Sequence, residues 1–404
     1  MLDLLLILIA VVTICVAAWR SNKLYQTYFT PWIMFLAVEV FVLHFLSIYS
    51  ANMLGLIDGG REFSLLINCS SIYIIGYSLA FWVRSEKSDQ IAFTILDAMP
   101  DVTSNFIAIF ASLILFGFGM FVLVYFGQAG LLWFSDPRLA YLSFRGATGD
   151  GALYALAQWT LMTATAVCIF SNKIKTWRIY IVLLVFVGIA YFLGSKQIML
   201  NLFIFALFVF ERTGRKISLT SLMVYFLILS SIFIALLLES DAGDDLSTAG
   251  YYFSEYAVNT MKIFSPHLGA MFRPGEFFFS NIWAYLPRFL FPGKPYEYGQ
   301  VLINSVLFPG AAEQGATPGL LYWSPYYLES GILGVFAFGF LRGFLEGSVF
   351  QALRRLPVQP LKILLAFSLS ITPMFLFAPP LYQYVFVLMI SAAIGVFNFG
   401  RSRT

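Results

Sequence analysis

The chain has 404 residues, of which 60% are hydrophobic, 18% aromatic and only 11% charged. A soluble domain carries roughly 25% charged residues because it needs a hydrated surface, so this composition excludes a water-soluble fold. The net charge of +3 is too small to indicate nucleic acid as a partner. Cys15, Cys69 and Cys168 all lie inside apolar runs without metal-ligand or redox spacing, so we expect neither a metal site nor a cofactor.

Apolar stretches along the chain predict an all-α membrane protein of about eleven transmembrane helices. A helix needs about 20 apolar residues to span the hydrocarbon, and about 17 is near the lower limit. Only helices and closed barrels satisfy their backbone groups in lipid, and these stretches show no strand-like alternation. The spans are expected near residues 2–19, 32–50, 63–83, 105–126, 153–170, 177–193, 197–210, 217–238, 326–350, 361–378 and 382–399.

Lysine and arginine in the loops predict the orientation of these helices. With the N-terminus outside, fifteen Lys and Arg residues fall on the inner side and eight on the outer side. Arg20 and Lys23 follow the first apolar run, which is the reverse of a cleavable signal peptide. We therefore expect a retained first helix, an outer N-terminus and an inner C-terminus.

Two outer segments interrupt this single transmembrane domain, at residues 127–151 and 239–325. Structureless loops as long as the second are uncommon and usually functional. Within it, residues 249–264 and 276–290 are typical of amphipathic helices that lie along the membrane face. The sequence shows no internal repeat, which argues against a transporter built from two related halves.

The outer side carries cations that the positive-inside bias disfavours, and an anionic ligand would offset their presence. The arginine fork suits phosphate because it makes paired, charge-assisted hydrogen bonds. The alternative interpretation is ordinary solvation, or attraction to anionic lipid headgroups. The candidate residues are Arg138, Arg145, Lys196, Arg273, Arg288 and Lys294.

Two of these cations lie beside predicted helix starts at the outer face, where free amide groups and the helix dipole favour anions. Arg145 opens one span within the segment Arg-Gly-Ala-Thr-Gly. Lys196 follows Gly194 and Ser195 in a tight turn, in which the serine can cap the next helix. A recessed lysine beside a helix start is a plausible phosphate cradle.

Among the ionisable residues within the predicted spans, two pairs lie close together in the sequence. Glu39 and His44 are five residues apart, about 140° around an α-helix, so we expect them to face apart and to have separate structural roles. Arg342 and Glu346 are four apart on one helix face, so we expect them to pair near the inner end.

These features resemble the bacterial oligosaccharide repeat-unit polymerases of the O-antigen polymerase (Wzy) type, which are related to the O-antigen ligases in the GT-C-like superfamily. The resemblance covers nearly the whole chain as architecture. Members often carry Arg followed eleven residues later by Gly in two outer loops, and His followed eight residues later by Gly. The matching residues are the pairs Arg138 and Gly149, Arg288 and Gly299, and His267 and Gly275, together with the proline-rich run at 287–295, the run at 317–334 and the Gly-Ser-Lys turn.

The turn departs from the family pattern, because Lys196 stands where relatives more often have arginine. Lysine binds phosphate as a point charge rather than through a fork.

The resemblance implies transfer of a growing glycan from undecaprenyl diphosphate to a sugar hydroxyl of the next lipid-linked repeat unit. Lipid diphosphate leaves, and its developing charge would be neutralised by preorganised cations. A general base must accept the hydroxyl proton. Glu329 and His267 are the candidates, with Glu313 and Asp150 behind them.

In this interpretation Arg288, Glu329 and His267 are catalytic, and the remaining outer cations bind the diphosphate. The active site would face the periplasm from the inner membrane, without a metal or other cofactor. The implied partners are lipid-linked oligosaccharides as donor and acceptor, membrane lipids, and a chain-length regulator of the polysaccharide co-polymerase class.

Three alternatives remain open. A carrier or flippase would move the lipid-linked glycan without making bonds, and it predicts charged residues deep in the bundle. The sibling ligase would transfer the glycan to a lipid A core, and sequence hardly separates it from a polymerase. A membrane acyltransferase usually has an early His or Arg at a helix start, which this sequence lacks.

We predict that Arg288→Ala abolishes chain elongation and leaves the protein level intact, because the departing diphosphate loses its forked cation. The measurement is the ladder of glycan lengths in cells that depend on the variant. A full ladder at normal protein level would remove Arg288 from the mechanism.

Overall fold

The computed structural model is helical throughout its described residues, with no strand among them. It describes residues 2–25, 35–83, 86–98, 106–144, 151–170, 176–194, 247–265, 275–280, 291–295, 297–310 and 319–357, together with single residues such as Trp32, Ile198 and Lys362. Three of the described helices are long and apolar enough to cross a membrane: Arg61–Phe81, Phe106–Phe126 and Ser324–Arg355. The all-α prediction is thus confirmed in this part of the chain, and the number of eleven spans stays a prediction.

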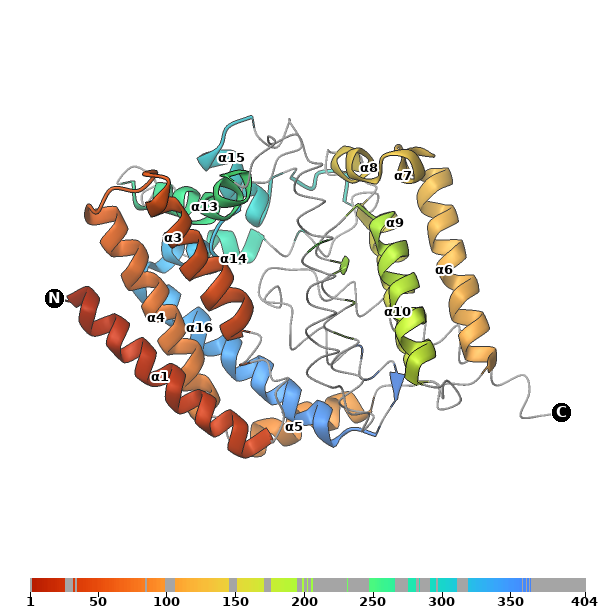
Figure 1. The fold of residues 1–404 in the computed structure, drawn as a ribbon, viewed down its shortest axis with the longest axis horizontal. Helices are drawn as coiled ribbons and strands as arrows, with labels where there is room; N and C mark the ends of the chain where they lie inside the picture. The colour runs from red at the N-terminus through yellow and green to blue at the C-terminus, as the bar shows by residue number, and fades with distance from the viewer. Residues whose placement is uncertain are drawn as a thin grey trace. The chain divides into compact units, whose positions relative to one another are not determined.

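The chain divides into two compact units, one formed by Met1–Ser88, Ser230–Phe350 and Ser370–Ala378 and the other by Asp89–Leu229, Gln351–Leu369 and Pro379–Thr404. In the first unit, α1 packs along α4, and α13 lies across α3, the π-helix η1 and α4 (Figure 1). The helices of this unit are α1 (Leu2–Tyr25), η1 (Phe35–Leu46), α3 (Ser47–Met53), α4 (Arg61–Val83), α13 (Ser247–Met261), the 3-10 helix η2 (Lys262–Phe264), α14 (Glu276–Ser280), α15 (Gln300–Leu307) and most of α16 (Ser324–Arg355).

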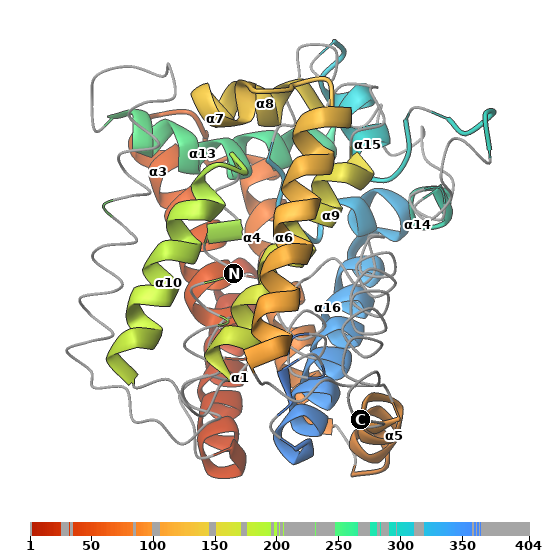
Figure 2. The same ribbon diagram turned by 90° about the vertical axis from the view of Figure 1, so that its right-hand side faces the viewer.

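The second unit is built around the packing of α9 against α6 and α10 (Figure 2). Gly119 of α6 allows this contact, because a Cβ there would lie 2.7 Å from the Thr160 hydroxyl and 3.3 Å from Ala157 Cα. Its helices are α6 (Phe106–Phe126), α7 (Leu132–Ser135), α8 (Pro137–Phe144), α9 (Gly151–Ile169) and α10 (Thr176–Tyr191); α5 (Glu86–Asp97) runs into it from the first unit.

Seven of the apolar stretches predicted as spans coincide with helices, namely α1, η1 with α3, α4, α6, α9, α10 and α16. The other four, at 197–210, 217–238, 361–378 and 382–399, lie almost wholly outside the described residues. The amphipathic helix predicted at 249–264 corresponds to α13 and η2. The one predicted at 276–290 begins as α14, and most of its remainder lies outside the described residues.

One face of α6 exposes large apolar side chains along the length of the helix. Phe106, Phe110, Ile114, Phe118 and Phe121 follow each other at intervals of three or four residues, and each is more than half exposed. Residues at this spacing share one face of a helix. A continuous stripe of this kind would be unfavourable in water, so we assign it to contact with lipid.

Glycines bring α4 and α16 into backbone contact. A Cβ on Gly76 of α4 would lie 2.6 Å from the carbonyl oxygen of Phe336. On α16, a Cβ on Gly339 or Gly343 would lie 2.5 Å from the carbonyl oxygens of Tyr73 and Tyr77 respectively. The two α16 glycines form a Gly-x-x-x-Gly motif, which is typical of close helix crossings in membranes.

The helix α16 does not run straight, because its backbone turns sharply at Gly331 (φ 61°, ψ −149°). The Tyr326 ring stacks on Phe338 with 4.0 Å between centroids, although twelve residues separate them. Twelve residues of straight helix would span about 18 Å. Residues 324–330 therefore fold back against the beginning of the long segment 332–355.

Gly76→Ala should destabilise the protein, whereas the matched change Gly117→Ala should not. A methyl at Gly76 enters the α16 backbone, and overpacking costs about 1–3 kcal/mol. A methyl at Gly117 on α6 meets nothing within 4 Å, so it gains only helix propensity, about 0.5–1 kcal/mol. Thermal unfolding in detergent compares the two variants, and equal midpoints would contradict the close crossing of α4 and α16.

Candidate functional site

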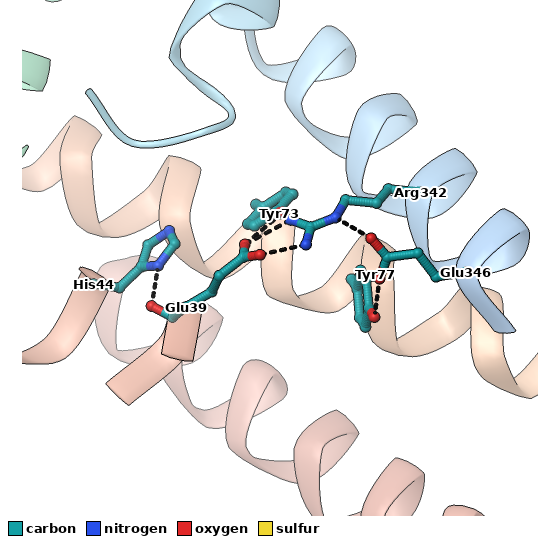
Figure 3. Close-up of polar contacts among 6 residues, drawn as sticks. All are labelled: Glu39, His44, Tyr73, Tyr77, Arg342 and Glu346. Carbon is teal, nitrogen blue, oxygen red and sulfur yellow. Dashed lines mark hydrogen bonds and ion pairs between the residues drawn. The ribbon is translucent and has the colours of Figure 1, made fainter. Parts of the chain in front are cut away.

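A buried group of charged and phenolic side chains connects three helices of the first unit (Figure 3). Arg342 of α16 donates from its two terminal nitrogens to both carboxylate oxygens of Glu39 on η1. Its Nε donates to Glu346 one turn further along α16, at 2.7 Å. All three side chains are at most 6% exposed, so the interaction is an ion-pair network shielded from water.

Two tyrosines of α4 complete this network. The Tyr73 hydroxyl donates to Glu39 at 2.9 Å and accepts from Arg342. The Tyr77 hydroxyl donates to Glu346 at 2.5 Å. Each carboxylate thus receives hydrogen bonds from both the arginine and one phenol. We call these five residues and His44 the Arg342 cluster.

Aromatic faces surround the guanidinium of Arg342. The rings of Phe35, Tyr77 and Tyr322 lie 5.8, 5.5 and 5.7 Å from its central carbon. A ring face attracts a cation within about 6 Å, most strongly where water is excluded. Tyr322 precedes the folded-back part of α16, so this segment reaches the depth of the buried ion pairs.

The helix η1 is a π-helix, and this changes the relation that an α-helix would give Glu39 and His44. Hydrogen bonds from residue i to i+5 bring residues five apart close together. The Nδ1 atom of His44 lies 2.7 Å from the carbonyl oxygen of Glu39, and its ring stacks on Tyr73 at 5.8 Å. The two residues therefore belong to one cluster. The predicted pairing of Arg342 with Glu346 is confirmed.

The sequence did not reveal that Glu39 is the second partner of Arg342 or that the tyrosines of α4 take part. Glu39 and Arg342 are 303 residues apart in the chain, so no local spacing connects them. The available signals were Tyr73 and Tyr77, four apart on α4, and the Gly-x-x-x-Gly motif around Arg342.

Apart from the Arg342 cluster, α13 holds the segment that leads into α16. Asn259 donates to the carbonyl oxygen of Gly319 at 3.3 Å, and Thr260 accepts from the amide of Leu321 at 2.9 Å. A Cβ on Gly319 would lie 2.7 Å from the Tyr256 ring. Burial, together with the neighbouring Tyr252 phenol, raises the pKa of Tyr256, so this phenol remains neutral at physiological pH.

Two of the predicted site residues are described in full, and both belong to the first unit. Glu329 is half-buried in the folded-back part of α16, two residues before the turn at Gly331. Lys294 is half-buried, and its ammonium lies 4.5 Å from the centre of the Tyr298 ring.

The remaining predicted residues are not described, or only in part. Arg138 lies on α8, and only its backbone is described. The other predicted residues fall outside the described part of the chain: Arg288, His267, Arg273, Arg145, Lys196, Glu313 and Asp150.

In the second unit, the turn before Lys196 packs directly on the helix that carries Arg138. A Cβ on Gly194 (φ 64°) would overlap the carbonyl oxygen of Pro137 and lie 2.7 Å from Tyr141 Cβ, both on α8. Tyr154 of α9 fixes the same turn, because its hydroxyl donates to the carbonyl oxygen of Leu193 at 3.0 Å. The last described residue of this turn, two residues before Lys196, thus touches the helix that carries Arg138.

Two of the glycines that match the spacings of the resembled family are also required by their backbone conformation. Gly275, eight residues after His267, has φ 85°, and Gly299, eleven residues after Arg288, has φ 56°. Only glycine adopts these values without strain. The Gly299 amide also donates to the Ser280 hydroxyl at 2.9 Å, which joins α15 to α14. The backbone conformation at these positions therefore requires glycine independently of the function of the protein.

Comparison with known proteins gave no match, since no protein-family model, no curated protein and no solved structure matches the chain. Among the described residues, no three His, Cys, Asp or Glu side chains lie close enough together to hold a metal ion. The chemistry of the site therefore has to be argued from its own residues.

Arg342→Gln should destabilise the protein far more than Asp97→Asn does. Removing one partner of a buried ion pair costs about 3–5 kcal/mol, because the remaining charge stays buried. Asp97 is half exposed and lies 3.4 Å from Lys362, and such pairs contribute about 1 kcal/mol or less. Thermal unfolding in lipid nanodiscs measures both, and similar midpoints would show that the Arg342 cluster is not an important structural contact.

Proposed function

We propose that this chain is a glycosyltransferase that polymerises undecaprenyl-diphosphate-linked oligosaccharide repeat units at the periplasmic face of a bacterial inner membrane. The observation that carries the proposal is the contact between Gly194 and α8. This contact sets Gly194, two residues before Lys196 in the chain, against the helix that carries Arg138, and a lipid diphosphate needs clustered cations. The three long apolar helices support a membrane location.

The proposed reaction forms one glycosidic bond and breaks one sugar–phosphate bond. A hydroxyl oxygen of the acceptor sugar attacks the anomeric carbon of the donor glycan. The bond from that carbon to the diphosphate oxygen breaks, and undecaprenyl diphosphate leaves with the electron pair. Glu329 or His267 accepts the hydroxyl proton, and the cations neutralise the charge on the leaving group. The reaction uses no nucleotide sugar.

A second candidate function is movement of the lipid-linked glycan without bond formation. The Arg342 cluster favours it, because ionisable residues buried within membrane helices often mark proton or substrate pathways. The absence of an internal sequence repeat argues against this second candidate, since many carriers consist of two related halves.

Incubation of the purified protein with lipid-linked repeat units alone tests the proposal. Products with several repeats support a polymerase. Products that appear only when lipid A core is added would replace it with a ligase. Unchanged substrate, with transfer of the lipid across the bilayer of proteoliposomes, would replace it with a carrier.

We expect Gly194→Ala to reduce polymer synthesis at least tenfold and Gly130→Ala to leave it within about twofold, because each decade requires about 1.4 kcal/mol of lost transition-state stabilisation. Both glycines have positive φ, so both alanines suffer the same backbone strain, about 1–2 kcal/mol. Only the Gly194 methyl would push the turn away from α8, since a Cβ on Gly130 meets nothing within 4 Å. Equal activity of the two variants, at equal protein level, would separate this turn from the reaction.

A further inference from the structure

The Arg342 cluster contains two carboxyl groups but only one guanidinium. Glu39 and Glu346 both bind the single guanidinium of Arg342. The other titratable groups that face them are Tyr73 and Tyr77 of α4, Tyr322 and His44. If both carboxyl groups were ionised and the phenols and imidazole neutral, the cluster would hold one net negative charge in a membrane-embedded bundle.

Glu39 is the carboxyl group that pairs most completely with Arg342. Both of its oxygens accept from the fork of Arg342, and one also accepts from Tyr73 at 2.9 Å. A two-pronged pairing of this kind is the strongest that a carboxylate can make with an arginine. Arg342 and Glu39 therefore form a neutral pair without a further ion.

Glu346 is the surplus carboxyl. It accepts only the Nε hydrogen of Arg342 at 2.7 Å and the hydroxyl hydrogen of Tyr77 at 2.5 Å. An unbalanced charge at this depth would cost several kcal/mol. We propose that Glu346 binds one exchangeable proton and that this proton makes the Arg342 cluster neutral.

His44 offers the competing place for that proton, and its contacts argue against it. The carbonyl oxygen of Glu39 can only accept, so the Nδ1 atom of His44 carries a hydrogen. The second nitrogen, Nε2, is buried and has no hydrogen-bond partner among the described residues. A proton added there would create a buried cationic N–H without an acceptor, which is costly. The proton therefore belongs on Glu346.

This proton site does not depend on the proposed glycan transfer. It follows from the contacts of η1, α4 and α16, whereas the transfer would use cations at the outer segments. A polymerase would use the site as a neutral link between helices, and a carrier could exchange its proton as a coupling ion. The test of the proton site can fail even if polymer synthesis is observed. It can also succeed even if no polymer synthesis is observed.

Infrared difference spectroscopy of the protein in lipid nanodiscs tests the proposal, because a protonated carboxyl group has a carbonyl stretch that an ionised one lacks. We expect a protonated carboxyl signal at neutral pH that shifts in heavy water. Glu346→Gln should remove it because the group is gone. Glu39→Gln should also remove it, because Glu346 then becomes the only counterion of Arg342 and ionises. Asp97→Asn, far from the cluster in sequence and half exposed, should keep it.

Size-exclusion profiles and thermal unfolding establish that each variant is folded. Glu346→Gln should retain its unfolding midpoint because the neutral pair of Arg342 and Glu39 remains. The proposal is overturned if the wild-type protein shows no such signal, or if the signal survives in folded Glu346→Gln. Nitrogen NMR of labelled histidine provides the second measurement, and a His44 imidazolium at neutral pH would place the proton there instead.

Discussion

A single guanidinium joins three helices of the first unit within an apolar environment. Arg342 of α16 binds Glu39 of η1, and the hydroxyl of Tyr73 on α4 lies between them. Lipid offers no water to replace these contacts, so separating the helices would leave charged groups unpaired at a cost of several kcal/mol. The charges themselves contribute little net stability compared with apolar residues. Their effect is to specify which helices pack together and in which register.

The close crossing of α4 and α16 and the Arg342 cluster depend on each other. Gly339 and Gly343 let the α16 backbone touch the carbonyl oxygens of Tyr73 and Tyr77. With larger residues at the two glycines, the helices would move apart and the phenols would lose the carboxylates. Conversely, the hydrogen bonds of Tyr73 with Arg342 and of Tyr77 with Glu346 hold the crossing at a distance where dispersion forces act over many atoms. Packing and polar pairing therefore fix the same geometry.

Local patterns in the sequence predicted much of this unit, and the long-range contacts escaped them. Apolar runs placed α4 and α16, and the spacing of Arg342 and Glu346 predicted their pairing, because both depend on residues near each other in the chain. The 140° angle between Glu39 and His44 assumed an α-helix and did not apply to the π-helix η1. Seven of the residues proposed for chemistry lie outside the described part of the structure, so their roles remain predictions.

The contacts of Arg342 also separate two kinds of cation in this protein. Its Nε and both terminal nitrogens already donate to carboxylates, so this arginine has little capacity left for a phosphate. A diphosphate ligand would have to compete with Glu39 and Glu346 in a medium that strengthens their attraction. The proposed diphosphate site therefore uses the cations of the predicted outer segments and leaves this arginine out. The buried arginine organises the helices, and the chemistry proposed for this protein lies elsewhere in the chain.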